Sequence, residues 1–130
     1  MKKLLLVAPL LLSFTLCISS CGKDDSEKSQ MKIVNTSWSD IRDKFAENSV
    51  EATDFYDKHA VQLTGYVSSI NQAVGYAGTL MMNFDADESV LAAIDISQKE
   101  KIKILKSGDS ITIVCYSVPV GMSLDDCSIK

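Results

Sequence analysis

The sequence of 130 residues contains few of the residue types that build most metal and catalytic sites. One His and four scattered Cys are too few for most multi-ligand zinc scaffolds. Two Pro and six Gly exclude collagen-like chains and Pro-rich disorder. A Gly-rich phosphate loop, an HExxH motif and a GxSxG motif are all missing. We therefore expect one domain without enzyme activity, cofactor or metal.

The start of the chain has the layout of a secretory signal, with Lys2 and Lys3 before an apolar run over residues 4–18. The run spans 15 residues, whereas a membrane-crossing helix needs roughly 20. Ile18-Ser19-Ser20-Cys21 resembles the lipobox of bacterial lipoproteins. In that class the cysteine thiol accepts a diacylglyceryl group, and a third acyl chain such as palmitate follows cleavage. We predict a signal peptide over residues 1–20 and lipid attachment at Cys21; an ordinary secretory signal is the alternative.

Residues 21–35 are predicted to be a lipid anchor and a flexible tether. Gly22–Gln30 (GKDDSEKSQ) has no large apolar residue, which indicates a solvated segment. Gly22 resembles the residue that directs Gram-negative lipoproteins to the outer membrane, so we expect an envelope location there, on the periplasmic or the surface side. Loss of Lys2 and Lys3 with the signal leaves 11 basic and 17 acidic residues, a net charge of −6. Such a domain repels phosphate backbones.

Residues 36–130 are predicted to form the folded domain. Ser37 and Asp40 resemble a capping box, and apolar spacing predicts a helix from Trp38 to Tyr56. Alternating patterns predict strands at 60–70, 76–84, 90–96, 110–117 and 122–129, with a short basic helix from Ser97 between the third and fourth. This order is typical of the OB-fold, a small barrel. The predicted class is mainly β with α: a five-stranded OB-fold-like barrel with an N-terminal helix.

Four short patterns resemble the tRNA_anti-like family of OB-fold domains, which is often found in bacterial lipoproteins. They are Asn48, Ala52, Tyr56 and Lys58; Leu63–Val67 with Ile70; Leu105–Asp109 before Ile111–Ile113; and Leu124–Ile129. Together they cover about 90 residues, from Trp38 to Ile129. The resemblance implies the OB-fold, and the family name does not establish nucleic-acid binding.

Two cysteines remain in the predicted domain, Cys115 and Cys127. In an oxidising compartment an even pair favours a disulfide, with two buried thiols as the alternative. A hairpin turning near Val120 would pair residue 115 with about 125, so Cys127 lies two positions out of register. Leu124 and Cys127 both suit an inward position although they differ by three, which predicts a bulge at Asp125-Asp126.

The charged and titratable candidates favour solvated surfaces over sites. His59 has no selectable nucleophile or acid partner, so we expect either an exposed histidine or one at the edge of a strand. Asp85, Asp87 and Glu88 lack EF-hand spacing and predict a solvated turn. Asp125-Asp126 suits an edge strand, where charge prevents aggregation. One basic patch is present, interrupted by Glu100 and formed by Lys99, Lys101, Lys103 and Lys106.

These observations support two hypotheses of different classes. The first is a non-enzymatic envelope lipoprotein whose OB-like module binds a protein or glycan partner at residues that the sequence does not identify. The second is a single-stranded oligonucleotide binder that uses the OB face. Nucleic acid is disfavoured because single-strand binders combine a basic groove with stacking aromatics, and both are sparse here. The sequence does not determine the oligomeric state.

Overall fold

The structure is a computed structural model that describes residues 25–85, 88–119 and 123–130. The predicted signal peptide, Cys21 and the start of the tether lie outside these residues. The described helices are α1 (Asp25–Gln30), α2 (Trp38–Glu47), α3 (Ser49–Lys58), the 3-10 turn η1 (Ile96–Gln98) and α4 (Lys99–Lys103). The strands are β1 (Lys32–Asn35), β2 (His59–Asn71), β3 (Gly78–Asn83), β4 (Ser89–Ile94), β5 (Ser110–Ser117) and β6 (Ser123–Ile129). The described part of the chain holds no helix long and apolar enough to cross a membrane.

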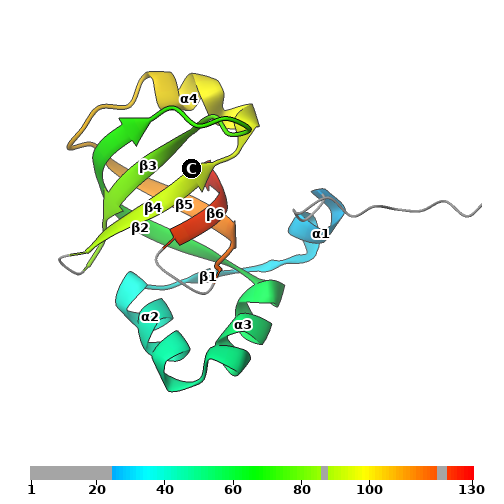
Figure 1. Ribbon diagram of the computed structural model, residues 1–130. Helices are drawn as coiled ribbons and strands as arrows, with labels where there is room; N and C mark the ends of the chain where they lie inside the picture. Colours follow the sequence, from blue (N-terminus) through cyan, green and yellow to red (C-terminus); the bar gives the residue numbers. More distant parts are fainter. Residues whose placement is uncertain (1–24, 86–87, 120–122) are drawn as a thin grey trace, which may run out of the picture.

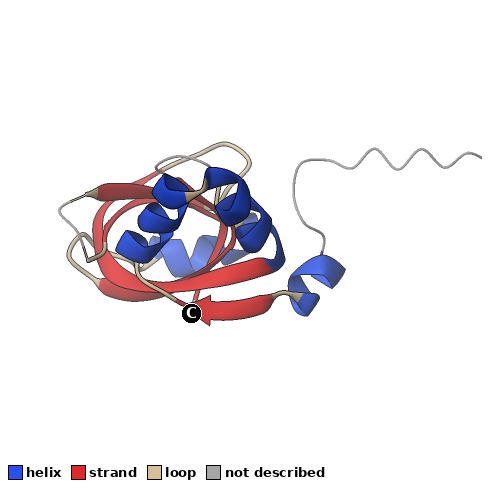
Figure 2. Ribbon diagram, turned by 90° about the horizontal axis from the view of Figure 1, so that it is seen from below, coloured by secondary structure: helices blue, strands red, loops and turns tan. Residues whose placement is uncertain are grey.

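Five of the strands form a closed barrel, which confirms the predicted fold class. The sheet order is β1-β2-β3-β4-β6-β5, and an additional pairing of β2 with β5 closes it. Most neighbours are antiparallel, but β4 and β6 are parallel, so the barrel is mixed. Figure 2 shows the strands curving around a common interior. The short helix between β4 and β5 lies where the OB-fold order predicts it.

The two ends of the barrel are covered by different helices (Figure 1). α4 lies at one end, and α2 with α3 lies at the other. Between them the interior is filled by large buried side chains, among them Leu80, Met82, Ile94, Ile113 and Leu124. Trp38 and Ile41 of α2 and Tyr56 of α3 join the same core, so the helices are part of the domain.

The predicted helix from Trp38 to Tyr56 is in fact two helices separated at Asn48. The Asn48 backbone is extended, with φ −155° and ψ 98°. It ends α2 through its N–H bond to the Lys44 carbonyl (3.0 Å) and begins α3 by accepting the Glu51 N–H at its side chain (3.2 Å). Asparagine is a strong N-cap residue, and this local competition overrides the helical periodicity. The predicted N-cap is confirmed: the Ser37 side chain accepts the Asp40 N–H at 3.1 Å, which is the first of the two bonds of a capping box.

The flexible tether predicted for residues 21–35 is wrong for its described part, which has regular structure. Most of residues 26–30 are exposed, as predicted for a solvated segment. Asp25–Gln30 forms α1, and Lys32–Asn35 forms β1, which pairs in parallel with residues 59–62 of β2. The regular structure therefore begins before the predicted boundary at residue 36. The cause is tertiary: the open edge of β2 accepts a strand whose own sequence, KIVN, gives only a weak strand signal.

Gly65 permits a close approach on β2 that any larger residue would prevent. A Cβ at this position would lie 2.6 Å from the Asn83 carbonyl oxygen and 2.6 Å from Cδ1 of Phe84. The missing side chain therefore leaves room for the Phe84 ring to lie over the strand. This contact fixes where the chain leaves β3.

Cys115 and Cys127 form a disulfide, with an S–S distance of 2.09 Å. The expected two-residue offset is wrong, because β5 and β6 pair Cys115 directly with Cys127 and Ser117 with Asp125. The predicted irregularity instead appears on the β4 side. There Ala92 pairs with Leu124 and Ile94 with Cys127, so β6 has one extra residue. Asp126 takes φ 52° within this bulge.

Candidate functional site

The outward side of β2, β3 and β4 is an uncharged surface, here called the outer face. We define it by Tyr66, Ser68, Thr79, Met81, Asn83, Ser89 and Leu91, which alternate with buried core residues. Cross-strand pairs place Tyr66 beside Asn83, and Met81 beside Leu91. Tyr66 is 60% exposed and Leu91 is 37% exposed. The outer face thus combines exposed apolar groups with neutral hydrogen-bonding groups.

The lack of charge extends along whole strands. β2, β3, β4 and β5 contain no Lys, Arg, Asp or Glu at any position. A phosphate backbone is held chiefly by Lys and Arg, so the outer face offers no electrostatic attraction for one. A neutral partner loses little hydration energy there, because hydroxyl and amide groups can replace its hydrogen bonds to water.

The acidic turn after β3 is exposed at Asp85, as predicted for a solvated turn, and it also fastens α2 to the barrel. Asp85 accepts hydrogen bonds from the backbone N–H groups of Trp38 (3.1 Å) and Ser39 (3.3 Å) and from the Ser39 hydroxyl. Glu88 accepts the indole N–H of Trp38 at 3.0 Å and pairs with Arg42 at 2.5 Å. Asp87 lies outside the described residues. Asp85 thus satisfies free N–H groups in the first turn of α2, where the helix dipole also favours negative charge. Glu88 instead holds the Trp38 and Arg42 side chains of the same helix.

The hydrogen bonds at Asp85 predict a pH-dependent stability. The Ser39 hydroxyl, followed by the backbone N–H groups of Ser39 and Trp38, lowers the pKa of Asp85 below its ordinary value of 3.8. The stabilisation is complete above that value and is lost as the pH falls through the lowered pKa. The free energy of unfolding, measured with urea from pH 5 downward, should therefore fall less steeply with decreasing pH in Asp85→Asn than in the wild type. Ser39→Ala should reduce the steepness in part; an unchanged steepness in Asp85→Asn would contradict this account.

Two lysines of the basic patch make contacts within the domain. Lys101 donates from Nζ to the Ile129 carbonyl at 2.8 Å, and Lys103 pairs with Glu100 at 3.0 Å. Beside them, Asp95 caps η1, and the Ser97 hydroxyl and N–H lower the pKa of its carboxyl group. Lys99, Lys101 and Lys103 lie on α4 at one end of the barrel. Lys106 lies in the loop after α4, and this loop contacts β2, because the Ser107 hydroxyl donates to the Ser68 carbonyl at 2.8 Å.

His59 has a structural role at the start of β2. Its ring stacks on Phe55 with a centroid distance of 4.1 Å, and Nδ1 lies 2.8 Å from the Phe55 carbonyl oxygen. An open hollow of about 390 Å³ adjoins it between α2 and α3, lined by residues of both charge signs. Among the described residues, no group of three or more His, Cys, Asp or Glu is placed to hold a metal ion. His59 thus completes a packed aromatic contact.

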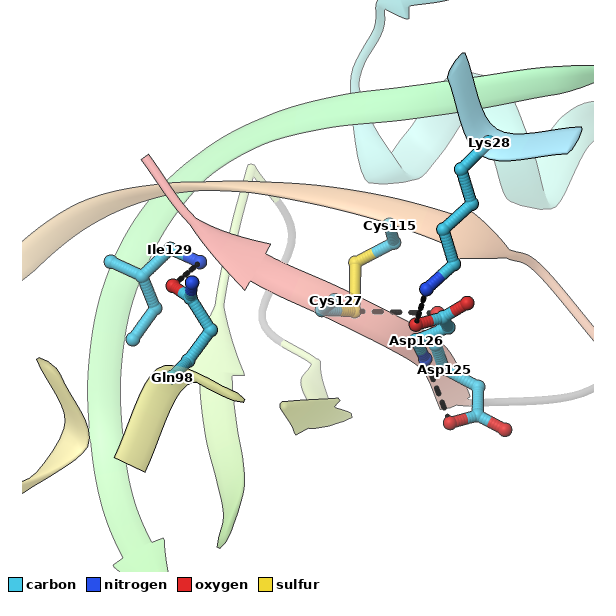
Figure 3. The surroundings of a disulfide bond; sticks show 7 residues. All are labelled: Lys28, Gln98, Cys115, Asp125, Asp126, Cys127 and Ile129. Carbon is cyan, nitrogen blue, oxygen red and sulfur yellow. Dashed lines mark hydrogen bonds and ion pairs between the residues drawn. A yellow bond between two sulfur atoms is a disulfide. The ribbon is translucent and has the colours of Figure 1, made fainter. Parts of the chain in front are cut away.

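The N-terminal segment contacts the barrel beside the disulfide, as Figure 3 shows. Lys28 of α1 pairs with Asp126 at 2.7 Å and lies over the Tyr116 ring at 5.5 Å. β6 lies between β4 and β5, so the interpretation of Asp125-Asp126 as edge charges is wrong. No local pattern points to Lys28, because its partner Asp126 is 98 residues away in the chain.

Comparison with known proteins was made at the level of family, sequence and fold. A family model described as tRNA_anti-like matches residues 3–126. A solved structure, that of a protein described as a nucleic acid-binding lipoprotein from Klebsiella pneumoniae subsp. pneumoniae MGH 78578, superposes with a TM-score of 0.55. It shares 15% sequence identity, and the match covers 84% of this chain and 99% of that one. This likeness shows the fold alone. No curated protein matches the sequence at a significant level.

Proposed function

The chain belongs to the tRNA_anti-like family, and on this premise we propose that it is a non-enzymatic binding module of the cell envelope. The outer face takes a neutral segment of a protein or a glycan. A lipid on Cys21 holds the module on its membrane, in the outer membrane of a Gram-negative bacterium. The structural neighbour described as a lipoprotein supports the envelope location.

One observation carries the choice of ligand: β2 to β5 contain no Lys, Arg, Asp or Glu. An OB-fold presents its ligand-binding surface on strands that correspond to β3 and β4 here, and on the adjoining loops. In this chain that surface offers Tyr66, Met81 and Leu91 among hydroxyl and amide groups. The composition supports contact through shape, apolar area and neutral hydrogen bonds.

The test places a photo-crosslinking residue at position 66 of the lipidated full chain in living cells. We expect a discrete adduct from this position and none from position 104, because Ile104 is 77% exposed but lies beyond the outer face. Leu91→Ala should weaken the adduct from position 66, since it removes an exposed apolar contact. Equal adducts from positions 66 and 104 would contradict the proposed function.

Single-strand binding is the alternative, favoured by the description of the structural neighbour. Fluorescence anisotropy with labelled oligonucleotides at low salt decides it, because phosphate contacts are strongest there. If an oligonucleotide binds and Tyr66→Ala abolishes binding, the alternative replaces the first proposal. No anisotropy change at high micromolar protein excludes it.

A further inference from the structure

A hollow of about 260 Å³ lies beside an open stretch of β2. β1 and β3 occupy successive lengths of the same edge of β2, because β1 pairs up to Gln62 and β3 pairs from Tyr66 onward. Residues 63–65 pair with β5 on the other edge, and neither β1 nor β3 reaches them. The chain that leads from β1 into α2 and the residues after β3 surround this gap. The extra strand β1 therefore creates the hollow.

The polar groups around the hollow are almost all neutral. They come from Asn35, Thr36, Ser37, Gln62 and Thr64. The hydroxyls of Ser37 and Thr64 already bond the Asp40 N–H and the Thr112 hydroxyl. The amides of Asn35 and Gln62, which both donate and accept hydrogen bonds, are therefore the main polar groups that a ligand can use. The Gln62 side-chain oxygen accepts from Lys130 Nζ at 3.0 Å, which orients the amide and leaves its NH₂ group as a donor.

The charge and the aromatic surface of the hollow further limit the kinds of ligand that it can bind. Among the described residues of the lining, Asp85 alone is charged, and its charge is negative. An anionic ligand would meet that carboxylate, and the ammonium group of Lys130 at the rim is already hydrogen-bonded to Gln62. Phe84 contributes a half-buried ring, held over Gly65 with its centroid 6.4 Å from that of Trp38. The hollow thus has an aromatic wall and a neutral polar rim.

We propose that this hollow binds one neutral sugar unit of a glycan. A pyranose ring presents hydroxyls around its rim and an apolar C–H face, which match the amides and hydroxyls on one side and Phe84 on the other. The hollow is smaller than the roughly 300–1,000 Å³ of drug-sized sites, so it suits one ring. The inference rests on the proposed function, because it makes a glycan the partner of the module.

The test uses the full chain in a zwitterionic detergent that contains no sugar, so that the detergent does not compete. Cellobiose and N,N′-diacetylchitobiose are the neutral probes, and oligo(dT) is the anionic one. We expect saturable amide shifts at residues 35–38, 62–65 and 84–85, with no such shifts from oligo(dT). The single tryptophan, Trp38, lines the hollow, so its fluorescence should change along the same binding curve.

Variants inside and outside the hollow show whether the sugar-induced shifts come from binding at the hollow. Asn35→Ala and Gln62→Ala should each weaken sugar binding roughly 2- to 10-fold, the effect of losing one neutral hydrogen bond. Gln72→Ala removes an exposed amide from the β2–β3 connection and should leave binding unchanged. Shifts confined to the outer face, equal effects of all three variants, or no shift up to the solubility limit would each overturn the inference.

Failure of this inference is distinguishable from failure of the proposed function. If both sugars leave the hollow unshifted while position 66 still forms its adduct, the sugar site is overturned and the outer face stands. If the sugars bind at the hollow while position 66 forms no adduct, the sugar site stands and the role of the outer face is overturned.

Discussion

Replacing Cys115 and Cys127 together by alanine should lower the free energy of unfolding by about 3 kcal/mol. The bond closes a loop with a sequence separation of 12 between two fully buried residues. Its loss releases chain entropy in the unfolded state, where the closed loop no longer restricts the backbone. Thermal unfolding followed by circular dichroism should show a midpoint lower by roughly 10–20 °C.

The single variants provide the control for this prediction. Cys115→Ala breaks the same bond as the double variant, so its unfolding free energy should fall by nearly as much. The wild-type protein measured in reductant should approach both variants, because the cross-link is then absent in all of them. A wild-type urea midpoint that does not respond to reductant would contradict the prediction.

The sequence predicted the strands well because their signals are local. β5 spans Ser110–Ser117, as the alternation of SITIVCYS predicts, and β6 begins within one residue of its predicted start. The predicted start of β3 at Tyr76 was wrong, since pairing begins at Gly78, which lies close to the Asn71 carbonyl oxygen and Ile102. Alternation identifies a strand, but the packing of neighbours determines where its pairing starts.

The features that the sequence could not supply depend on distant residues. The direct pairing of Cys115 with Cys127 joins residues on different strands. The parity of Leu124 and Cys127 indicated the bulge without showing which neighbouring strand it faces. β1 and α1 are held by β2 and Asp126, so their own residues predicted a tether. The absence of charged residues from these strands is visible in the sequence. Only the barrel shows which of their residues point outward and so form the outer face.

The same distinction applies to the acidic turn. Asp85 and Glu88 are 47 and 50 residues from Trp38 in the chain, so no local pattern joins them to α2. Their spacing in the sequence does not match that of a calcium-binding EF-hand loop, so the sequence indicated only a turn. In the fold Asp85 accepts backbone N–H groups at the start of α2, and Glu88 binds the Trp38 indole and the Arg42 side chain.

Trp38→Ala should destabilise the domain by about 3–5 kcal/mol, the usual cost of removing a buried aromatic ring. Trp38 is 2% exposed, lies at the start of α2 and joins the core shared by the barrel and both long helices. Its removal also leaves Glu88 without the indole donor. Urea unfolding followed by far-ultraviolet circular dichroism measures the effect without requiring tryptophan fluorescence.

Two further substitutions separate packing from hydrogen bonding at this position. Trp38→Phe keeps most of the apolar contact but loses the N–H group, so it should cost less than Trp38→Ala. Val50→Ala, at an 80% exposed position of α3, should change stability by less than about 0.5 kcal/mol. If Trp38→Ala were as mild as Val50→Ala, α2 would not be fastened to the barrel by this ring. The ring contact between Trp38 and Phe84, which both line the hollow, would then contribute little to holding Phe84 in place.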